Sequence, residues 1–203
     1  MINELLSKRV QAIAPSGIRK FFDIANQMEN VISLGVGEPD FATPWHIRDE
    51  AIYALEKKRT AYTANSGLWE LRQEIARYLE RRFGLEYDPQ DQILVTIGGS
   101  EAIDLALRAL INPGDEVIVP EPTYVSYRPA VIMAGGVPVA VPTYEEREFR
   151  LTAEDLLPHI TPRTKAVILC YPNNPTGAVM ERQDLERIAA VLSQHSLVVI
   201  TDE

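Results

Sequence analysis

Several short loops in the sequence carry residues suited to holding a small, charged ligand. In segment 98–101, two glycines, a serine and an acid open a helix pattern, where free backbone N–H groups and the helix dipole favour a phosphate. Segment 120–124 ends in Tyr124, whose ring can stack on a planar ligand. Segment 171–177 holds two asparagine amides between prolines that restrict the backbone. Asp202 adds a carboxylate, which is costly beside an apolar sheet unless it pairs with a cation or a donor.

Each of these loops also has an ordinary structural explanation. Ser100 can be a plain helix N-cap, and Asp202 can cap whatever element follows it. Tyr124 can pack at the start of a helix, and the two asparagines can close Asx turns. Segment 98–101 lacks the Gly-Lys-Ser/Thr of a P-loop and the glycine spacing of a dinucleotide fingerprint. No loop identifies a ligand by itself, so a binding site requires that the fold bring them together.

The elements predicted around these loops place them at one edge of a sheet. Apolar, β-branched runs alternate with amphipathic helix patterns, which is typical of an α/β fold with a mainly parallel sheet and helices on both faces. The predicted strands are 93–97, 116–119, 137–141, 166–170 and 197–201, and the predicted helices among them are 100–111, 124–134, 152–157 and 181–193. Pro138 indicates an edge strand or a strand end. Ligands of open α/β sheets bind at the carboxyl ends of the strands, so we expect the loops to meet there.

The first 40 residues are organised differently from the rest. Two short helix patterns, about 2–13 and 18–28, precede an extended run that breaks into a Gly/Pro/Asp loop. We therefore predict an N-terminal arm and entry loop over 1–40, and a partial ligand-binding large domain over 41–203. Thr43 and Pro44 are expected to begin the first helix of that domain as N-cap and first helical residue. The sequence stops directly after a strand pattern, so we expect the sheet to be incomplete at its C-terminus.

Composition disfavours several classes of protein. Of the 203 residues, 46% are hydrophobic and 24% are charged, which is ordinary for a globular protein and argues against disorder. The net charge of −9 makes nonspecific binding to nucleic acid or to an anionic membrane unfavourable. The apolar runs fall far short of the ~20 residues of a bilayer span, and the N-terminus lacks a signal-peptide pattern. The lone Cys170 cannot form an internal disulfide. We expect a cytoplasmic protein with no nucleic-acid or membrane partner and no metal site.

One kind of molecule would satisfy all of these loops at once. A planar, phosphorylated ring with a cationic nitrogen could use the helix start, the aromatic side chain, the amides and the carboxylate together, and pyridoxal phosphate is such a molecule. Its phosphate would lie at 98–101, its ring under Tyr124, its ring oxygen at Asn174 and its pyridinium nitrogen at Asp202.

The sequence resembles the class I/II aminotransferases, which are pyridoxal-phosphate enzymes of fold type I. The resemblance runs in order from about residue 2 to the last residue. Its most specific pieces are Gly-Glu-Pro-Asp-Phe at 37–41 and Asn-Pro-Thr-Gly at 174–177. The other matching pieces are 33–36, Tyr62-Thr63 with Gly67, 98–102, 120–124, 171–173 and 201–203.

The resemblance implies a role for each matched residue. Tyr124 would stack on the cofactor ring, Asn174 would hydrogen-bond its phenolic oxygen, and Asp202 would pair with the pyridinium nitrogen and keep it protonated. Gly37, together with Asn174, would lie at the substrate. The residues implied at the cofactor phosphate are Gly99, Ser100 and Glu101.

The resemblance also implies shared sites in a homodimer, because Tyr62 would reach the cofactor phosphate of the neighbouring subunit. It further implies cis peptide bonds before Pro122 and Pro175, which cost little at proline. The lysine that forms the Schiff base in this family lies beyond the segment matching 201–203. No lysine of this sequence stands in that position, and Lys165 is interpreted as a solvated residue at the start of a strand.

We therefore predict an aminotransferase that moves an amino group between an amino acid and a 2-oxo acid, of which the 203-residue chain alone is inactive. One alternative is a pyridoxal-phosphate-dependent carbon–sulfur β-lyase, since the same fold supports several reactions. Another is a non-catalytic regulatory domain of fold type I. That alternative is disfavoured because the sequence shows neither a DNA-binding helix pair before residue 40 nor a net basic charge.

Overall fold

The computed structural model describes residues 2–15, 17, 24, 28, 30–32 and 39–203. The chain divides into two compact units, Met1–Pro15 with Ile97–Glu203 and Ser16–Thr96. The predicted helix at about 18–28 and the predicted site residue Gly37 lie outside the described residues. The division of the chain near residue 40 into an arm and a large domain stays a prediction.

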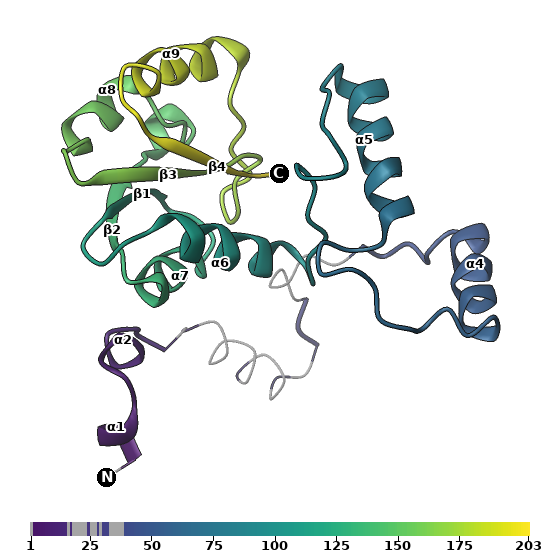
Figure 1. The fold of residues 1–203 in the computed structure, drawn as a ribbon. Coiled ribbons are helices and arrows are strands. Elements are labelled where there is room, and N and C mark those ends of the chain that lie inside the picture. The colour runs from purple at the N-terminus through teal and green to yellow at the C-terminus, as the bar shows by residue number, and fades with distance from the viewer. Residues whose placement is uncertain (1, 16, 18–23, 25–27, 29, 33–38) are drawn as a thin grey trace. The chain divides into compact units, whose positions relative to one another are not determined.

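Four of the predicted strands form a single parallel sheet (Figure 1). They are β1 (Glu116–Glu121), β2 (Val137–Pro142), β3 (Thr164–Cys170) and β4 (Val198–Asp202). Their order is β2-β1-β3-β4, so Pro138 lies on an edge strand, as predicted. A proline there removes no hydrogen bond between central strands. The predicted α/β fold with a parallel sheet is confirmed.

Helices cover both faces of this sheet, as predicted. Figure 1 shows α6 (Gly99–Leu110) and α7 (Tyr127–Ala134) on one face, and α8 (Ala153–Leu156) and α9 (Arg182–Leu192) on the other. Alternate residues of a strand point to opposite faces, and β1 shows this clearly. Val117 and Val119 pack with the first helix pair, and Ile118 packs with the second. Both central strands are thus buried on both sides, which explains why they read as continuous apolar runs.

Several shorter elements complete the first unit. The predicted helix at 2–13 is instead two helices, α1 (Ile2–Leu5) and α2 (Lys8–Gln11), because the Ser7 side chain accepts a hydrogen bond from the Val10 N–H and starts a new helix. Arg9 of α2 donates to the carbonyl of Met133 at the end of α7 over 3.1 Å. Short 3₁₀ turns occur at Glu145–Arg147 (η1) and Leu157–His159 (η2).

The second unit contains α4 (Trp45–Glu56) and α5 (Trp69–Phe83). The first of these begins one residue later than predicted, with Pro44 rather than Thr43 as its N-cap. Arg72 of α5 is buried, and its Nη1 donates to the carbonyls of Pro89 and Gln90, over 2.7 and 3.1 Å. This side chain ties the loop that follows α5 back to the helix.

The prediction of a strand at 93–97 is wrong, because these residues form no strand in the structure. They pair with no strand in the part of the chain that the structure describes. The Val95 N–H instead donates to the Ser66 carbonyl over 3.1 Å, and Ile97 is 93% exposed. Apolar, β-branched composition favours an extended backbone, but a strand also needs a hydrogen-bonding partner, which composition cannot supply.

A buried carboxylate joins the amino-terminal ends of the two central strands. Glu116 is 5% exposed, and its carboxylate accepts from Thr161 Oγ1 over 2.6 Å and from Arg163 Nε over 2.9 Å. The hydrogen bond from Thr161, helped by Arg163, lowers the pKa of Glu116 against the opposing effect of burial. This end of the sheet lies opposite the strand ends that carry the predicted ligand loops.

We predict that Glu116→Gln lowers the free energy of unfolding at pH 7 by about 1–2 kcal/mol, since charged hydrogen bonds are replaced by weaker ones. A lowered folded-state pKa gives a contribution that is present at neutral pH and is lost as the pH falls through that pKa. The difference between native protein and variant should therefore shrink below about pH 4 in urea titrations. Exposed Glu146→Gln is the control, and an undiminished difference at low pH would contradict the assignment.

Candidate functional site

The predicted ligand loops leave neighbouring strands at the same edge of the sheet. Within the parallel pair of β3 and β4, Cys170 is the register partner of Asp202, so the loop 171–177 starts beside that carboxylate. β1 lies on the other side of β3 and leads into the segment that carries Tyr124. Figure 1 shows α6 starting on the side of the sheet where β3 and β4 end. The fold therefore brings together the elements that carry the predicted cofactor contacts of the first unit.

Asp202 is held by a tyrosine that no motif in the sequence indicated. The Tyr127 hydroxyl donates to Asp202 Oδ2 over 2.6 Å. Tyr127 is the first residue of α7 and is 1% exposed. Burial raises the pKa of the Tyr127 hydroxyl, and its hydrogen bond to Asp202 raises that pKa further, so the phenol stays protonated and donates. The only feature of the sequence that could have indicated Tyr127 is its position three residues after Tyr124. A tyrosine at such a position in a helix is usually interpreted as a core residue.

Tyr124 lies next to this pair. Its ring meets the Tyr127 ring edge to face, with centroids 5.5 Å apart and planes at 75°. Such edge-to-face contacts favour a defined ring orientation. The half-buried Tyr124 ring is thus held by the same side chain that holds the carboxylate.

The start of α6 is open in the way that a phosphate site requires. Gly98 is the N-cap at φ 81°, a left-handed conformation that suits glycine, and no side chain caps the helix. A Cβ at Gly98 or Gly99 would meet nothing within 4 Å. Ser100 lies inside the first turn, so the explanation of Ser100 as a plain N-cap is wrong. The Glu101 carboxylate accepts a hydrogen bond from the Ile97 N–H. An anion would therefore be bound by the backbone N–H of Glu101 rather than by its side chain.

The two adjacent asparagines have different environments. Asn173 is buried, and its Oδ1 accepts from the Thr176 N–H and Oγ1, over 3.3 and 3.0 Å. The Asn173 carbonyl accepts from the Gly177 N–H over 2.8 Å, with Gly177 at φ 71°. The Asx-turn explanation is therefore correct for Asn173. Asn174 is exposed at the tip of this turn, where its amide can reach a ligand.

The peptide bonds before Pro122 and Pro175 are cis, as the resemblance implies, and the bond before Pro172 is cis as well. Tyr62, in the second unit, has a fully exposed side chain, and its role toward a neighbouring subunit stays a prediction. The described residues contain no group of three or more histidines, cysteines or acids that could hold a metal. In the same part of the chain, every helix is too short or too polar to cross a membrane.

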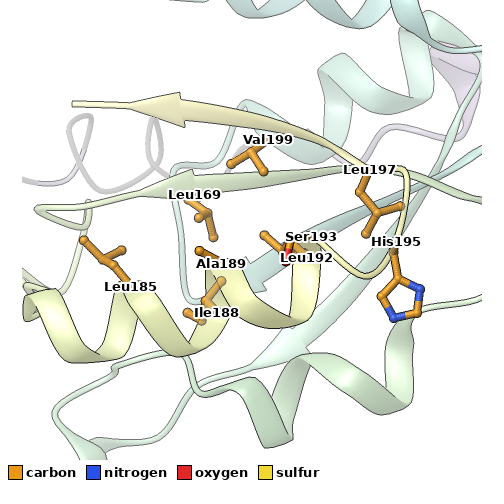
Figure 2. Close-up of a pocket in the computed structure, with 9 residues that line it drawn as sticks. All are labelled: Leu169, Leu185, Ile188, Ala189, Leu192, Ser193, His195, Leu197 and Val199. Carbon is orange, nitrogen blue, oxygen red and sulfur yellow. The ribbon is translucent and has the colours of Figure 1, made fainter. Parts of the chain in front are cut away.

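A separate hollow of about 420 Å³ lies between α9 and strands β3 and β4 (Figure 2). Its lining is almost entirely aliphatic, with Ser193 and His195 as the polar exceptions. The aliphatic residues are Leu169, Leu185, Ile188, Ala189, Leu192, Leu197 and Val199. Such a lining offers little to a phosphate or a carboxylate, so we do not place the charged ligand there.

Comparison with known proteins gives consistent matches. The family model for aminotransferase class I and II matches residues 29–203. The chain is 50% identical to an aspartate aminotransferase of Pyrococcus abyssi and 48% identical to an aromatic-amino-acid aminotransferase of Thermococcus litoralis. Both matches cover 98% of this chain and 51% of the relative, so the chain spans about half the length of these curated relatives.

Solved structures give the same result. A single mutant of the aspartate aminotransferase of Thermus thermophilus matches with a TM-score of 0.90 and 42% identity, over 98% of this chain and 53% of that one. At this level of identity the likeness covers sequence as well as fold.

The unequal environments of the paired asparagines lead to a stability prediction. Asn173→Ala should lower the free energy of unfolding by about 1–3 kcal/mol, because it leaves the half-buried N–H and hydroxyl groups of Thr176 without their acceptor. Asn174→Ala, one position along the same turn, should change it by less than about 0.5 kcal/mol. Urea unfolding of the two variants provides the measurement. Equal losses of unfolding free energy would contradict the assignment of a structural role to Asn173 alone.

Proposed function

Because this chain belongs to the class I and II aminotransferase family, we propose that the whole protein is an aminotransferase that moves an amino group between an amino acid and a 2-oxo acid. The observation that carries the proposal is the Asp202 carboxylate at the end of β4. It lies beside the start of the 171–177 loop, and a phenol rather than a cation holds it. A carboxylate in that position is ready to pair with a cationic ring nitrogen.

The residues at this edge suit the family's cofactor. Class I and II aminotransferases depend on pyridoxal phosphate, which supplies an electron sink for negative charge at the substrate α-carbon. The uncapped start of α6 offers N–H groups and a positive dipole end for a phosphate. The half-buried Tyr124 ring offers a flat apolar surface for a heteroaromatic ring. Phosphate, ring and ring nitrogen thus each have a chemically matched partner.

In the proposed mechanism, each residue of this chain has a defined task. The Asp202 carboxylate would hold a proton on the pyridinium nitrogen, which would keep the ring electron-poor. The exposed Asn174 amide would donate to the phenolic ring oxygen and, with Gly37, would orient the substrate. Tyr124 would fix the plane of the ring, and backbone N–H groups of the first turn of α6 would hold the phosphate in place.

Substrate, assembly and location are proposed from the relatives and from the chemistry. The matched aminotransferases of Pyrococcus abyssi and Thermococcus litoralis act on aspartate or on aromatic amino acids according to their names, so we propose an amino acid of one of these classes as the donor. We also propose a cytoplasmic homodimer in which Tyr62 reaches the neighbouring subunit's cofactor phosphate. An exposed tyrosine ring is available for such a contact.

The test is an amino-transfer assay of the full-length protein with aspartate or phenylalanine as donor and 2-oxoglutarate as acceptor. We expect turnover, and we expect Asp202→Asn to lower kcat/KM by at least about 100-fold because the ring nitrogen loses its charged partner. Asp104→Asn is the matched control, since its carboxylate pairs with Arg108 on the surface of α6.

Release of pyruvate from cystathionine without an oxo-acid acceptor, in place of amino transfer, would contradict the proposal and favour the β-lyase. An unchanged kcat/KM in Asp202→Asn would remove Asp202 from the mechanism.

A further inference from the structure

We propose that Tyr127 is a positioning residue, whose hydroxyl fixes the Asp202 carboxylate by Oδ2 so that Oδ1 faces the pyridinium nitrogen. The inference rests on the proposed function, because it concerns the carboxylate assigned there to the ring nitrogen. It assigns a task to a tyrosine that does not itself touch the cofactor.

The bond between these residues is short and joins distant parts of the chain. The Tyr127 hydroxyl and Asp202 Oδ2 are 2.6 Å apart, and the residues are 75 positions apart in sequence. This distance is at the short end for hydroxyl donors and is typical of a charged acceptor. The contact links the start of α7 to the end of β4.

The donor cannot move away from the carboxylate. Tyr127 is 1% exposed and belongs to the apolar cluster that includes Leu107, Val131 and Ile168. A ring packed in this way keeps its rotamer, so the position of its hydroxyl is set by the core. A carboxylate with one oxygen tied to a fixed point also loses most of its freedom to rotate.

The described neighbours of the Asp202 carboxylate do not neutralise its charge. Within the described residues, no lysine, arginine or histidine forms an ion pair with Asp202. Besides Asp202, the polar side chain that interacts with the Tyr127 hydroxyl is Cys170, whose thiol also points to the Pro172 carbonyl. A neutral phenol donates without cancelling the negative charge, so the carboxylate keeps its attraction for a pyridinium.

Tyr127 also supports the ring contact of the site. Its edge-to-face contact with Tyr124 involves the aromatic ring and not the hydroxyl. Replacing tyrosine with phenylalanine keeps this contact and the core packing, and removes only the hydrogen bond to Asp202. The substitution therefore separates positioning of the carboxylate from the packing of the helix.

The competing explanation is purely structural: a buried phenol needs an acceptor, and Asp202 happens to be the nearest one. Under that explanation, loss of the hydroxyl affects stability alone. Under the positioning role, it also changes the environment of the ring nitrogen. The two explanations differ in what a spectroscopic probe on that nitrogen reports.

The experiment uses the full-length protein and pyridoxal phosphate labelled with ¹⁵N at the ring nitrogen. The variants are Tyr127→Phe, Asp202→Asn and the control Tyr171→Phe. Tyr171 is a half-buried tyrosine whose hydroxyl, like that of Tyr127, forms a hydrogen bond: it accepts from the Leu151 N–H over 3.3 Å. Tyr171 packs with the cluster on the opposite face of the sheet. The readouts are the ¹⁵N chemical shift, the Kd for pyridoxal phosphate and the melting temperature of the cofactor-free protein, which shows whether each variant folds.

We expect Tyr127→Phe to weaken pyridoxal phosphate binding about tenfold and to move the ¹⁵N shift toward that of an unprotonated pyridine. Tyr171→Phe should change the Kd for pyridoxal phosphate by less than about twofold and should leave the ¹⁵N shift unchanged. If Asp202→Asn changes both readouts and Tyr127→Phe behaves like Tyr171→Phe, the positioning role is overturned while the proposed function stands. If Asp202→Asn leaves the ¹⁵N shift unchanged, the pairing of Asp202 with the ring nitrogen fails, and the role of Tyr127 fails with it.

Discussion

The interaction on which the candidate site depends is a hydrogen bond from a neutral phenol to a carboxylate at the end of a half-buried strand. A charge beside an apolar sheet needs a partner, and a cationic side chain would both satisfy and neutralise it. Tyr127 satisfies one oxygen of Asp202 and leaves its charge in place. The edge of the sheet thereby keeps a fixed negative group, which is what a protonated ring nitrogen requires.

The parallel sheet explains why the other proposed contacts gather around that group. Parallel strands end at the same edge, and the register of β3 with β4 sets the start of the asparagine turn next to Asp202. Helices on both faces bury almost all of β1 and β3, so these strands form a rigid support. At the other end of these strands, Glu116 and Arg163 join the amino-terminal ends of β1 and β3. Bracing the far end leaves the loops at the carboxyl end available for binding.

Much of this arrangement could be predicted from the sequence, because local composition determines it. β-branched runs flanked by helix patterns predicted the strands of the sheet, and Pro138 indicated that its strand, β2, lies at an edge of the sheet. Pairing, by contrast, depends on distant partners, and the strand predicted at 93–97 has none in the described part of the chain. Asn173 and Asn174 are identical in type, and only the turn closed by Gly177 buries one and exposes the other. Tyr127 was missed because a tyrosine on the apolar face of a helix is typical of a core residue, and its acceptor lies 75 residues away.

The most direct measurement of the central claim is a crystal structure of the full-length protein with pyridoxal phosphate bound. We predict that the ring nitrogen lies within about 3 Å of Asp202 Oδ1, while Oδ2 keeps its bond to the Tyr127 hydroxyl. A ring nitrogen more than about 6 Å from Asp202, or one that contacts a different side chain, would contradict this claim.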